Sequence, residues 1–264
     1  MPSIHATAIV EEGANLADDV IVGPYAFISA KATLKSGVEV MQGAQVYGST
    51  KIGEDTKIYP YAIIGLPPQD IGYKEEDDVS VEIGRGNTIR EFVTINAGTQ
   101  KGGGITRIGS NCFIMIYCHI AHDCQVGNNV IMANNATLAG HVHVGSFTVI
   151  GGMTPIHQFV HIGEGVMIGG ASAVSQDIPH FCLAEGNRAV VRGLNKVGLK
   201  RRFEKEDILA IQAAYRVLFR SENAIKETAT QLLQSEKNEK VLQLCNFIMD
   251  SKRGIPYERK MNDE

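Results

Sequence analysis

A period of six residues runs through most of this chain and narrows what it can fold into. An aliphatic residue or a methionine stands at every sixth position over three stretches, from Ile4 to Ile64, from Ile83 to Ile95 and from Ile108 to Val174. Neither a helix nor a single strand repeats every six residues. A coil with three short flat faces does, because each face ends in a corner and points its aliphatic side chain into a narrow core. The period therefore predicts a mainly β fold, a parallel β-helix of hexapeptide repeats with about eighteen residues in each coil.

Two breaks in this period predict loops that leave the three-sided prism of coils, one near residues 66–80 and one near 97–105. After Val174 the period ends, and from about Glu204 apolar residues recur at the spacing of amphipathic helices. We therefore expect a β-helix over residues 1–187 and an α-helical C-terminal domain over residues 188–264. The helical part would shield the open β edge of the last coil.

Charge and cysteine usage exclude several classes of protein. The net charge is −4, so no global attraction to nucleic acid is expected. The five cysteines are odd in number and form no C-x-x-C pair, which argues against a disulfide framework or a structural zinc site. Because we also find no signal peptide and no long apolar run, we expect a cytoplasmic protein with no stable membrane insertion.

The hexamer HIAHDC at residues 119–124 brings two histidines and an aspartate together. Because one coil takes about eighteen residues, we expect Gly140 to lie beside His122, and His141 beside Asp123. On outward-facing positions, His122 could act as a general base near neutral pH, and Asp123 could fix its tautomer. The backbone N–H of Gly140, with no side chain in front of it, could stabilise an oxyanion.

Two other interpretations of these histidines stay open on the residues alone. The histidines could decorate a solvated face of the prism. They could also bind zinc through His119, His122 or His141 across a subunit boundary, as in the carbonic anhydrases built on this kind of β-helix. In those enzymes, however, the ligating pair on one strand has a wider spacing than the pair in this chain.

A block of basic residues follows the repeats. Residues 187–202 hold six basic side chains and no acidic one: Arg188, Arg192, Lys196, Lys200, Arg201 and Arg202. In an acidic protein such a block predicts a polyanionic partner, either a phosphate-bearing substrate or an acidic protein. The glycines at 193 and 198 argue against a regular helix in this segment.

The chain resembles the UDP-N-acetylglucosamine acyltransferase family over essentially its whole length. Beyond the repeats, five motifs carry the resemblance: QKGGG at 100–104, HIAHDC at 119–124, NNATLAGHV at 134–142, GGMTPIHQF at 151–159 and GLKRR at 198–202. The resemblance implies a left-handed β-helix and the transfer of an R-3-hydroxyacyl chain from acyl carrier protein to the 3-position of UDP-GlcNAc. This reaction is the first step of lipid A biosynthesis. It takes place in clefts between the subunits of a homotrimer and needs no cofactor on the enzyme, because the donor carries phosphopantetheine on acyl carrier protein.

The resemblance also implies roles for single residues. His122 is the expected general base, Asp123 orients it, and the Gly140 amide polarises the thioester carbonyl. Gly170 matches the position whose side chain limits acyl length, so glycine there predicts a long chain. The expected substrate-binding residues are Asp70, His119, His141, His157, Gln158, Asn195, Arg201 and Arg202.

Several positions depart from the family's usual pattern, and they cluster where the sugar and nucleotide are held. They are Gly72, Asn96, Ala97, Arg188 and Val197. The departures leave open the same reaction on the 3-amino analogue of the sugar, which would give an amide. Further alternatives are the later N-acyltransferase of the same pathway, a trimeric zinc hydratase of the carbonic anhydrase type and a non-enzymatic β-helical scaffold.

Overall fold

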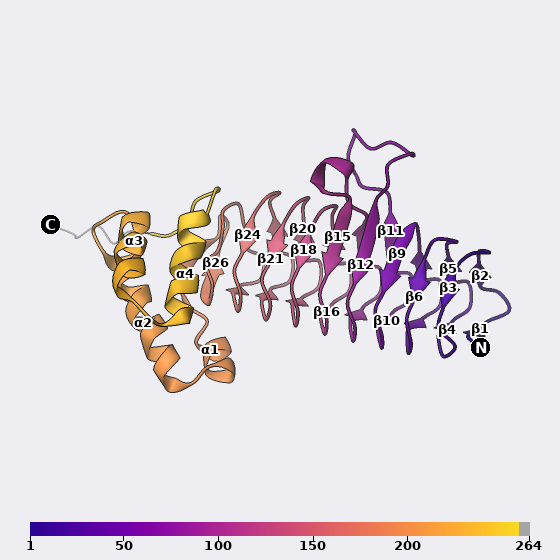
Figure 1. Cartoon of the computed structure of the whole chain (residues 1–264), viewed down its shortest axis with the longest axis horizontal. Helices are drawn as coiled ribbons and strands as arrows, with labels where there is room; N and C mark the ends of the chain where they lie inside the picture. The colour runs from indigo at the N-terminus through magenta and orange to yellow at the C-terminus, as the bar shows by residue number, and fades with distance from the viewer. Residues whose placement is uncertain (259–264) are drawn as a thin grey trace.

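The protein is a long prism of short parallel strands with a group of helices at its C-terminal end (Figure 1). The computed structural model describes residues 1–258, so the last six residues of the expected helical domain lie outside the described part. Three sheets of parallel strands, called here A, B and C, form the sides of the prism, and successive strands from β1 to β25 enter A, B and C in turn.

The strands of each sheet pair with strands one coil away. Sheet A contains, in order, β1 (Ser3–Ile4), β4 (Ile21–Val22), β7 (Glu39–Val40), β10 (Lys57–Ile58), β13 (Thr88–Ile89), β16 (Phe113–Ile114), β19 (Ile131–Met132), β22 (Val149–Ile150), β25 (Met167–Ile168), β26 (Cys182–Glu185) and β27 (Val190–Leu194). Sheet B contains β2 (Ile9–Val10), β5 (Phe27–Ile28), β8 (Gln45–Val46), β11 (Ile63–Leu66), β14 (Thr94–Asn96), β17 (His119–Ile120), β20 (Thr137–Leu138) and β23 (Pro155–Ile156). Sheet C contains β3 (Asn15–Leu16), β6 (Thr33–Leu34), β9 (Ser49–Ile52), β12 (Ser80–Ile83), β15 (Ile105–Ile108), β18 (Gln125–Val126), β21 (His143–Val144) and β24 (His161–Ile162).

The register confirms the expected coil length. His119 pairs with Thr137 and Ile120 with Leu138, so strands of one sheet repeat every eighteen residues where no loop intervenes. The last residue of most strands is the periodic aliphatic, and Ile120 is completely buried in the core. Ile4 follows the same pattern but is 45% exposed, because no coil lies beneath the first one.

The turns between sheets define three corners, and both loops leave the prism at one of them. Residues 67–79 connect β11 to β12, and residues 97–104, with the short 3-10 helix η1 (Gln100–Gly102), connect β14 to β15. Both connections therefore run from sheet B to sheet C, at what we call the B–C corner. Figure 1 shows the two loops projecting from the same side of the prism.

The C-terminal part differs from the expectation in two places. Residues 190–194, assigned to the helical part, form strand β27, which pairs antiparallel with β26, the strand that covers the edge of β25. Residues 196–202 form helix α1 (Lys196–Arg202) despite Gly198, because the side chain of Asn195 caps it by accepting a hydrogen bond from the Gly198 N–H at 3.0 Å.

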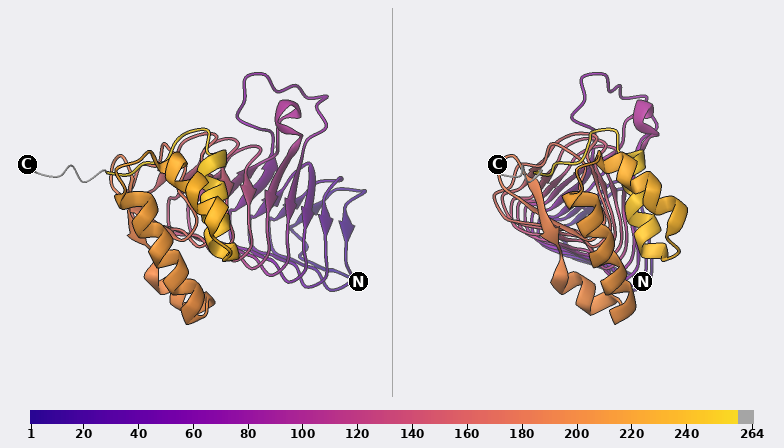
Figure 2. Two further views of the ribbon diagram at one scale, coloured as in Figure 1. Left: turned by 60° about the vertical axis from the view of Figure 1, so that its left-hand side comes forward. Right: turned by 90° about the vertical axis from the view of Figure 1, so that its left-hand side faces the viewer.

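The expected amphipathic helices follow. They are α2 (Lys205–Arg220), α3 (Ile225–Ser235) and α4 (Glu239–Asp250), which pack against one another at the end of the prism (Figure 2). Within residues 1–258, none of the helices combines the length and the apolar character needed to cross a bilayer.

All five cysteines are free and buried, and burial raises the pKa of the Cys118 thiol to about 11.

Candidate active site

The B–C corner gathers most of the expected site residues. The turn after β17 carries His122, and the turns one and two coils further on carry His141 and the pair His157–Gln158. The loop 67–79 with Asp70 leaves the prism at the same corner. Residues that are far apart in the sequence are stacked here because each coil of the β-helix lies directly on the preceding coil.

His122 and Asp123 form a hydrogen-bonded pair. Their Nδ1 and Oδ2 atoms lie 2.8 Å apart, and the side chains are 14% and 1% exposed. A carboxylate only accepts hydrogen bonds, so the Asp123 contact places the imidazole proton on Nδ1. The Nε2 atom of neutral His122 is then left with a lone pair, as a general base requires.

The burial of Asp123 corrects the expectation that it faces outward. The Thr99 backbone N–H donates to Oδ1 at 2.8 Å, and the Thr99 hydroxyl donates to Oδ2 at 2.7 Å. Gly102 packs so closely that a Cβ there would collide with the carboxylate. The loop 97–104 therefore sits on Asp123 and shields it from water, so the carboxylate's effect on His122 is stronger than at a solvated corner.

Sequence reasoning missed the two threonines that hold Asp123. Thr106 accepts a hydrogen bond from the Asp123 backbone N–H at 2.8 Å, and Thr99 is also the N-cap of η1 through its contact with the Gly102 N–H. Thr106 stands two residues before the periodic Ile108, at an inward slot that other coils fill with small or β-branched residues. That position was the available signal, because a hydroxyl in a dry slot needs a polar partner.

Gly140 provides the space that His122 occupies. A Cβ at this glycine would lie 2.6 Å from Nε2 and 2.5 Å from Cε1 of His122, so the ring rests directly against the glycine backbone. Among residues 1–258 the Gly140 N–H has no hydrogen-bond acceptor, as is usual at this turn position, but here no side chain stands in front of it. The amide can therefore donate to an oxygen that develops negative charge beside His122.

The other histidines of this corner form a wall around the pair. The His141 ring is perpendicular to that of His122, with centroids 5.1 Å apart, and it stacks on Phe159 at 4.5 Å. His119 bonds through Nδ1 to the Thr94 hydroxyl at 2.7 Å, and burial, with a smaller effect of His122, lowers its pKa. A neutral His119 is suited to hydrogen bonding with a substrate rather than to ion pairing.

His157 and Gln158 lie at the open end of the same corner. Both side chains are exposed, and His157 Nδ1 is 3.1 Å from the Gln158 backbone carbonyl oxygen. Gln158 occupies the position of His122 two coils further along the prism. The two side chains are therefore free to contact a ligand that extends along the corner from His122.

Asp70 lines a small cavity between the two loops. The cavity has a volume of about 220 Å³, and its walls include Asp70, Lys74, Thr99 and Lys101. Asp70 Oδ1 accepts a hydrogen bond from the Gly72 N–H at 2.7 Å, and the Lys101 ammonium lies 3.6 Å from where a Cβ at residue 72 would be. Because Thr99 also contacts Asp123, this cavity adjoins the His122 pair. Lys101 was not among the expected site residues.

The remaining expected residues lie at the other two corners. Asn195, Arg201 and Arg202 belong to α1 and its cap, next to the turn between β24 and β25 that joins sheet C to sheet A. Gly170 lies where sheet A turns to sheet B, and a Cβ there would meet nothing closer than the Gly152 carbonyl oxygen at 3.4 Å. One copy of the chain therefore does not bring His122, Gly170 and the α1 residues together.

A metal-binding geometry exists at the candidate base. Among residues 1–258, His122, Asp123 and His141 form the group whose ligand atoms lie within 4.8 Å of one another. The Asp123 oxygens already accept hydrogen bonds from the Thr99 N–H, the Thr99 hydroxyl and His122. A metal ion would have to replace these donors, so the observed contacts favour a base with its orienting carboxylate.

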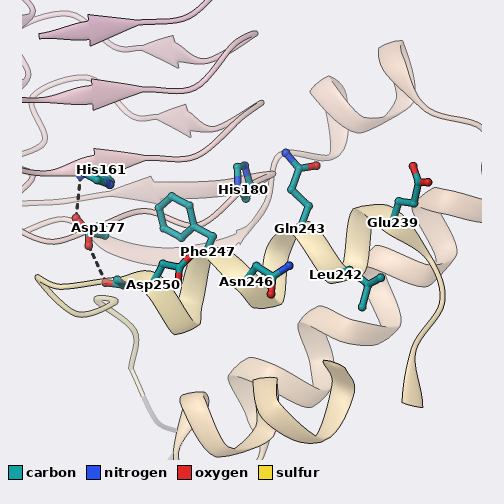
Figure 3. A pocket seen from close by; sticks show the side chains of 10 residues that line it. His161, Asp177, His180, Glu239, Leu242, Gln243, Asn246, Phe247 and Asp250 are labelled. Carbon is teal, nitrogen blue, oxygen red and sulfur yellow. Dashed lines mark hydrogen bonds between the residues drawn. The ribbon is translucent and has the colours of Figure 1, made fainter. Parts of the chain in front are cut away.

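A larger cavity lies elsewhere, between α4 and the last coils (Figure 3). Its volume is about 560 Å³, and its lining includes His161, Asp177, His180 and Phe247. None of the expected site residues lines it.

Comparison with known proteins adds family information. A family model described as Udp N-acetylglucosamine O-acyltransferase, domain 2, matches residues 177–256, and one described as bacterial transferase hexapeptide (six repeats) matches residues 105–140. A protein from Campylobacter jejuni (strain RM1221) named acyl-[acyl-carrier-protein]–UDP-N-acetylglucosamine O-acyltransferase is 56% identical over 263 residues, which cover 100% of each chain. A protein of the same name from Campylobacter concisus (strain 13826) is 54% identical over 256 residues, 97% of this chain and 98% of that protein.

Solved structures agree with these sequence matches. The structure of UDP-N-acetylglucosamine acyltransferase from Campylobacter jejuni has a TM-score of 0.93 and 55% identity, and the match covers 97% of this chain and 100% of that chain. These likenesses confirm the expected left-handed parallel β-helix of hexapeptide repeats followed by helices.

Proposed function

This chain belongs to the UDP-N-acetylglucosamine O-acyltransferase family, and from that premise we propose that it transfers an R-3-hydroxyacyl chain from acyl carrier protein to the 3-hydroxyl of UDP-GlcNAc. This is the first step of lipid A biosynthesis. The observation that carries the proposal is the His122–Asp123 pair, 2.8 Å apart and set against the bare backbone of Gly140. The arrangement supplies a base, its orienting acid and an oxyanion donor at one corner.

In the proposed mechanism each of these three groups has one role. His122 Nε2 accepts the proton of the sugar hydroxyl while the oxygen attacks the thioester carbonyl carbon. The Gly140 N–H donates to the oxyanion of the tetrahedral intermediate, and Asp123 stabilises the imidazolium. When the C–S bond breaks, the departing thiolate of the pantetheine arm takes the proton from His122, which returns the enzyme to its starting state.

The loops are proposed to hold the acceptor. Asp70 and Lys101 face the cavity between the loops, next to Thr99 and so close to Asp123. A carboxylate can accept from sugar hydroxyls, and an ammonium can meet a nucleotide phosphate. His119, His141, His157 and Gln158 would line the path along the corner.

A homotrimer is proposed because one chain distributes the site over three corners. Cyclic symmetry lets one surface of each copy face a different surface of the next, which produces a closed ring. Such a ring can place Gly170 and the α1 residues of one copy beside His122 of its neighbour. The three sites would then lie in clefts between subunits.

The basic residues near α1 are proposed to receive acyl carrier protein. A cavity of about 690 Å³ beside α2 is lined by Arg192, Lys196, Arg216 and Arg220, among others. A cationic surface steers the approach of an acidic protein. The donor supplies its own phosphopantetheine, so we propose no cofactor for the enzyme, and we propose that it works in the cytoplasm.

One experiment tests the reaction and the acceptor atom together. Hydroxyacyl carrier protein is offered to the purified protein with UDP-GlcNAc and its 3-amino analogue in competition, and the products are identified by mass spectrometry. We expect the ester of UDP-GlcNAc. An amide product would identify the amino sugar as the substrate, and no product with either sugar would refute the proposed function.

Replacing the base tests the mechanism. His122→Ala should reduce kcat by about 10²- to 10⁴-fold, because the base is lost while the fold rests on the coil core. His143→Ala, on sheet C, is the matched control and should keep the wild-type rate. A His122→Ala enzyme with near-normal turnover would remove His122 from the mechanism.

A further inference from the structure

Glu164 ties two helices to the last coils of the β-helix. It lies in the turn between β24 and β25, and its side chain is 23% exposed. Oε1 forms an ion pair with Arg202 at the end of α1, and Oε2 accepts a hydrogen bond from Gln243 of α4 at 3.1 Å. Its backbone N–H donates to His180 Nδ1 at 2.7 Å. In Figure 3, Gln243 projects from the side of α4 that faces the β-helix, as does Phe247, next to His180.

Arg202 is enclosed by aromatic rings as well as by this ion pair. The centre of its guanidinium lies 4.2 Å from the Phe147 ring centroid and 4.8 Å from that of Phe203. A Cβ at Gly165, where φ is +65°, would collide with its Nη1 atom, so the glycine leaves room for the guanidinium. The Arg202 side chain is only 16% exposed, and burial lowers its pKa. Stacking and ion pairing together hold an arginine firmly in one place.

The neighbouring arginine is placed differently. Successive residues of a helix point about 100° apart, so Arg201 does not share the direction in which Arg202 meets the prism. Arg201 is exposed, and no carboxylate among residues 1–258 forms an ion pair with it. Arg201 is therefore accessible to a substrate, whereas Arg202 is largely enclosed by the protein.

Both ends of α1 are anchored to one turn of the β-helix. At its start, Asn195 Nδ2 donates to the Gly165 carbonyl oxygen at 3.0 Å while its Oδ1 caps the helix. At its end, Arg202 pairs with Glu164. A helix of seven residues has little stability of its own, so these anchors determine where its exposed side chains lie.

We propose that Glu164 is a positioning residue for acyl transfer, a step that rests on the proposed function. The ion pair with Glu164 holds Arg202 in place, and Arg202 in turn holds α1. In this arrangement Arg201 is the arginine that meets a substrate phosphate, whereas Arg202 affects the substrate only through its pairing with Glu164. This differs from the expectation that both arginines contact the substrates. It also gives a role to a residue that the sequence analysis did not single out.

The substitution Glu164→Gln distinguishes a positioning role of Glu164 from direct phosphate binding by Arg202, because the two predict changes of KM in different directions. Glutamine keeps the shape and the acceptor oxygen of residue 164 but removes the charge. If Glu164 positions α1, KM for one substrate should rise about five- to tenfold with kcat little changed, the range expected for the loss of one coupling within a contact network. If Arg202 is itself the phosphate ligand, removing its competing carboxylate should lower KM or leave it unchanged, which would overturn the proposal.

A double-mutant cycle tests whether Arg202 acts through Glu164. Arg202→Gln and Glu164→Gln should each raise KM, and the double variant should raise it no further than the larger single effect. Arg201→Gln, the matched control, should raise KM by the same factor with or without Glu164. Fully additive effects of the two paired substitutions would refute the coupling.

Hydrogen exchange separates failure of this proposal from failure of the proposed function. Glu164→Gln should increase amide exchange in residues 196–202, whether or not the enzyme turns over, because the helix opens more often once its anchor is weakened. Unchanged exchange together with unchanged KM would reject the positioning role. A wild-type protein with no acyl transfer would instead reject the function. If Arg202→Gln does not fold, Arg202→Lys replaces it in the cycle.

Discussion

The substitution Asp123→Asn tests how the buried carboxylate controls its histidine. The environment determines which way the new amide must face. The Thr99 backbone N–H can only donate and lies 2.8 Å from Oδ1, so the amide oxygen has to occupy that position. The amide nitrogen then stands at the Oδ2 position, 2.8 Å from Nδ1 of His122.

Two donors cannot face each other at this distance, so the imidazole proton has to move from Nδ1 to Nε2. His122 would then present an N–H to the sugar hydroxyl instead of a lone pair. We expect kcat to fall by about 10²- to 10⁴-fold, the range for loss of a general base and for the wrong tautomer in a hydrogen-bonded triad. Stability should change by only about 1 kcal/mol, because the Thr99 hydroxyl can turn to accept from the new amide.

The assay follows release of the carrier-protein thiol at saturating substrate, with thermal unfolding measured in parallel. Thr99→Val is the matched control, since it removes one donor to Asp123 but leaves the carboxylate and its bond to His122. Its kcat should fall much less. A folded Asp123→Asn enzyme whose kcat lies within about threefold of wild type would show that the tautomer of His122 does not limit the reaction.

Three further outcomes follow from the geometry. Gly140→Ala should reduce kcat by about 10²-fold in the same assay, because its Cβ would displace the His122 ring that lies 2.5 Å from it, and full activity would place the base elsewhere. Gly170→Leu should remain folded, since the nearest atom to its Cβ is 3.4 Å away, and should shift donor preference to shorter acyl chains; unchanged preference, measured with donors of different length, would remove Gly170 from the acyl path. Burial, with a smaller effect of Lys240, lowers the pKa of His180 to about 4, so its neutral form should contribute stability that is fully present above pH 6.5 and is lost as pH falls toward 4. The loss is about 3 kcal/mol, and unfolding measured from pH 4 to 7 should show a weaker pH dependence in His180→Gln, whereas identical profiles would contradict this assignment.

The sequence by itself determined the prism and the principal contact of the site. Every residue in a coil has a neighbour a whole coil away, so counting eighteen positions from His122 was enough to find Gly140 beside it. The same period predicted both loops, because a coil that is interrupted must resume in the same register. These features follow from backbone pairing that repeats at a fixed interval, and the interval can be read directly from the aliphatic residues.

Only the tertiary structure decided the contacts that do not follow the period. Thr99 holds Asp123 from a separation of 24 residues, and Arg202 pairs with Glu164 from a separation of 38, neither of them a multiple of eighteen. Such contacts depend on how a loop folds back or how a helix packs, and no repeat in the sequence encodes either. The β-helix therefore fixed which residues share a corner, whereas the loop and α1 fixed that Asp123 is buried and that Arg202 faces the protein instead of solvent.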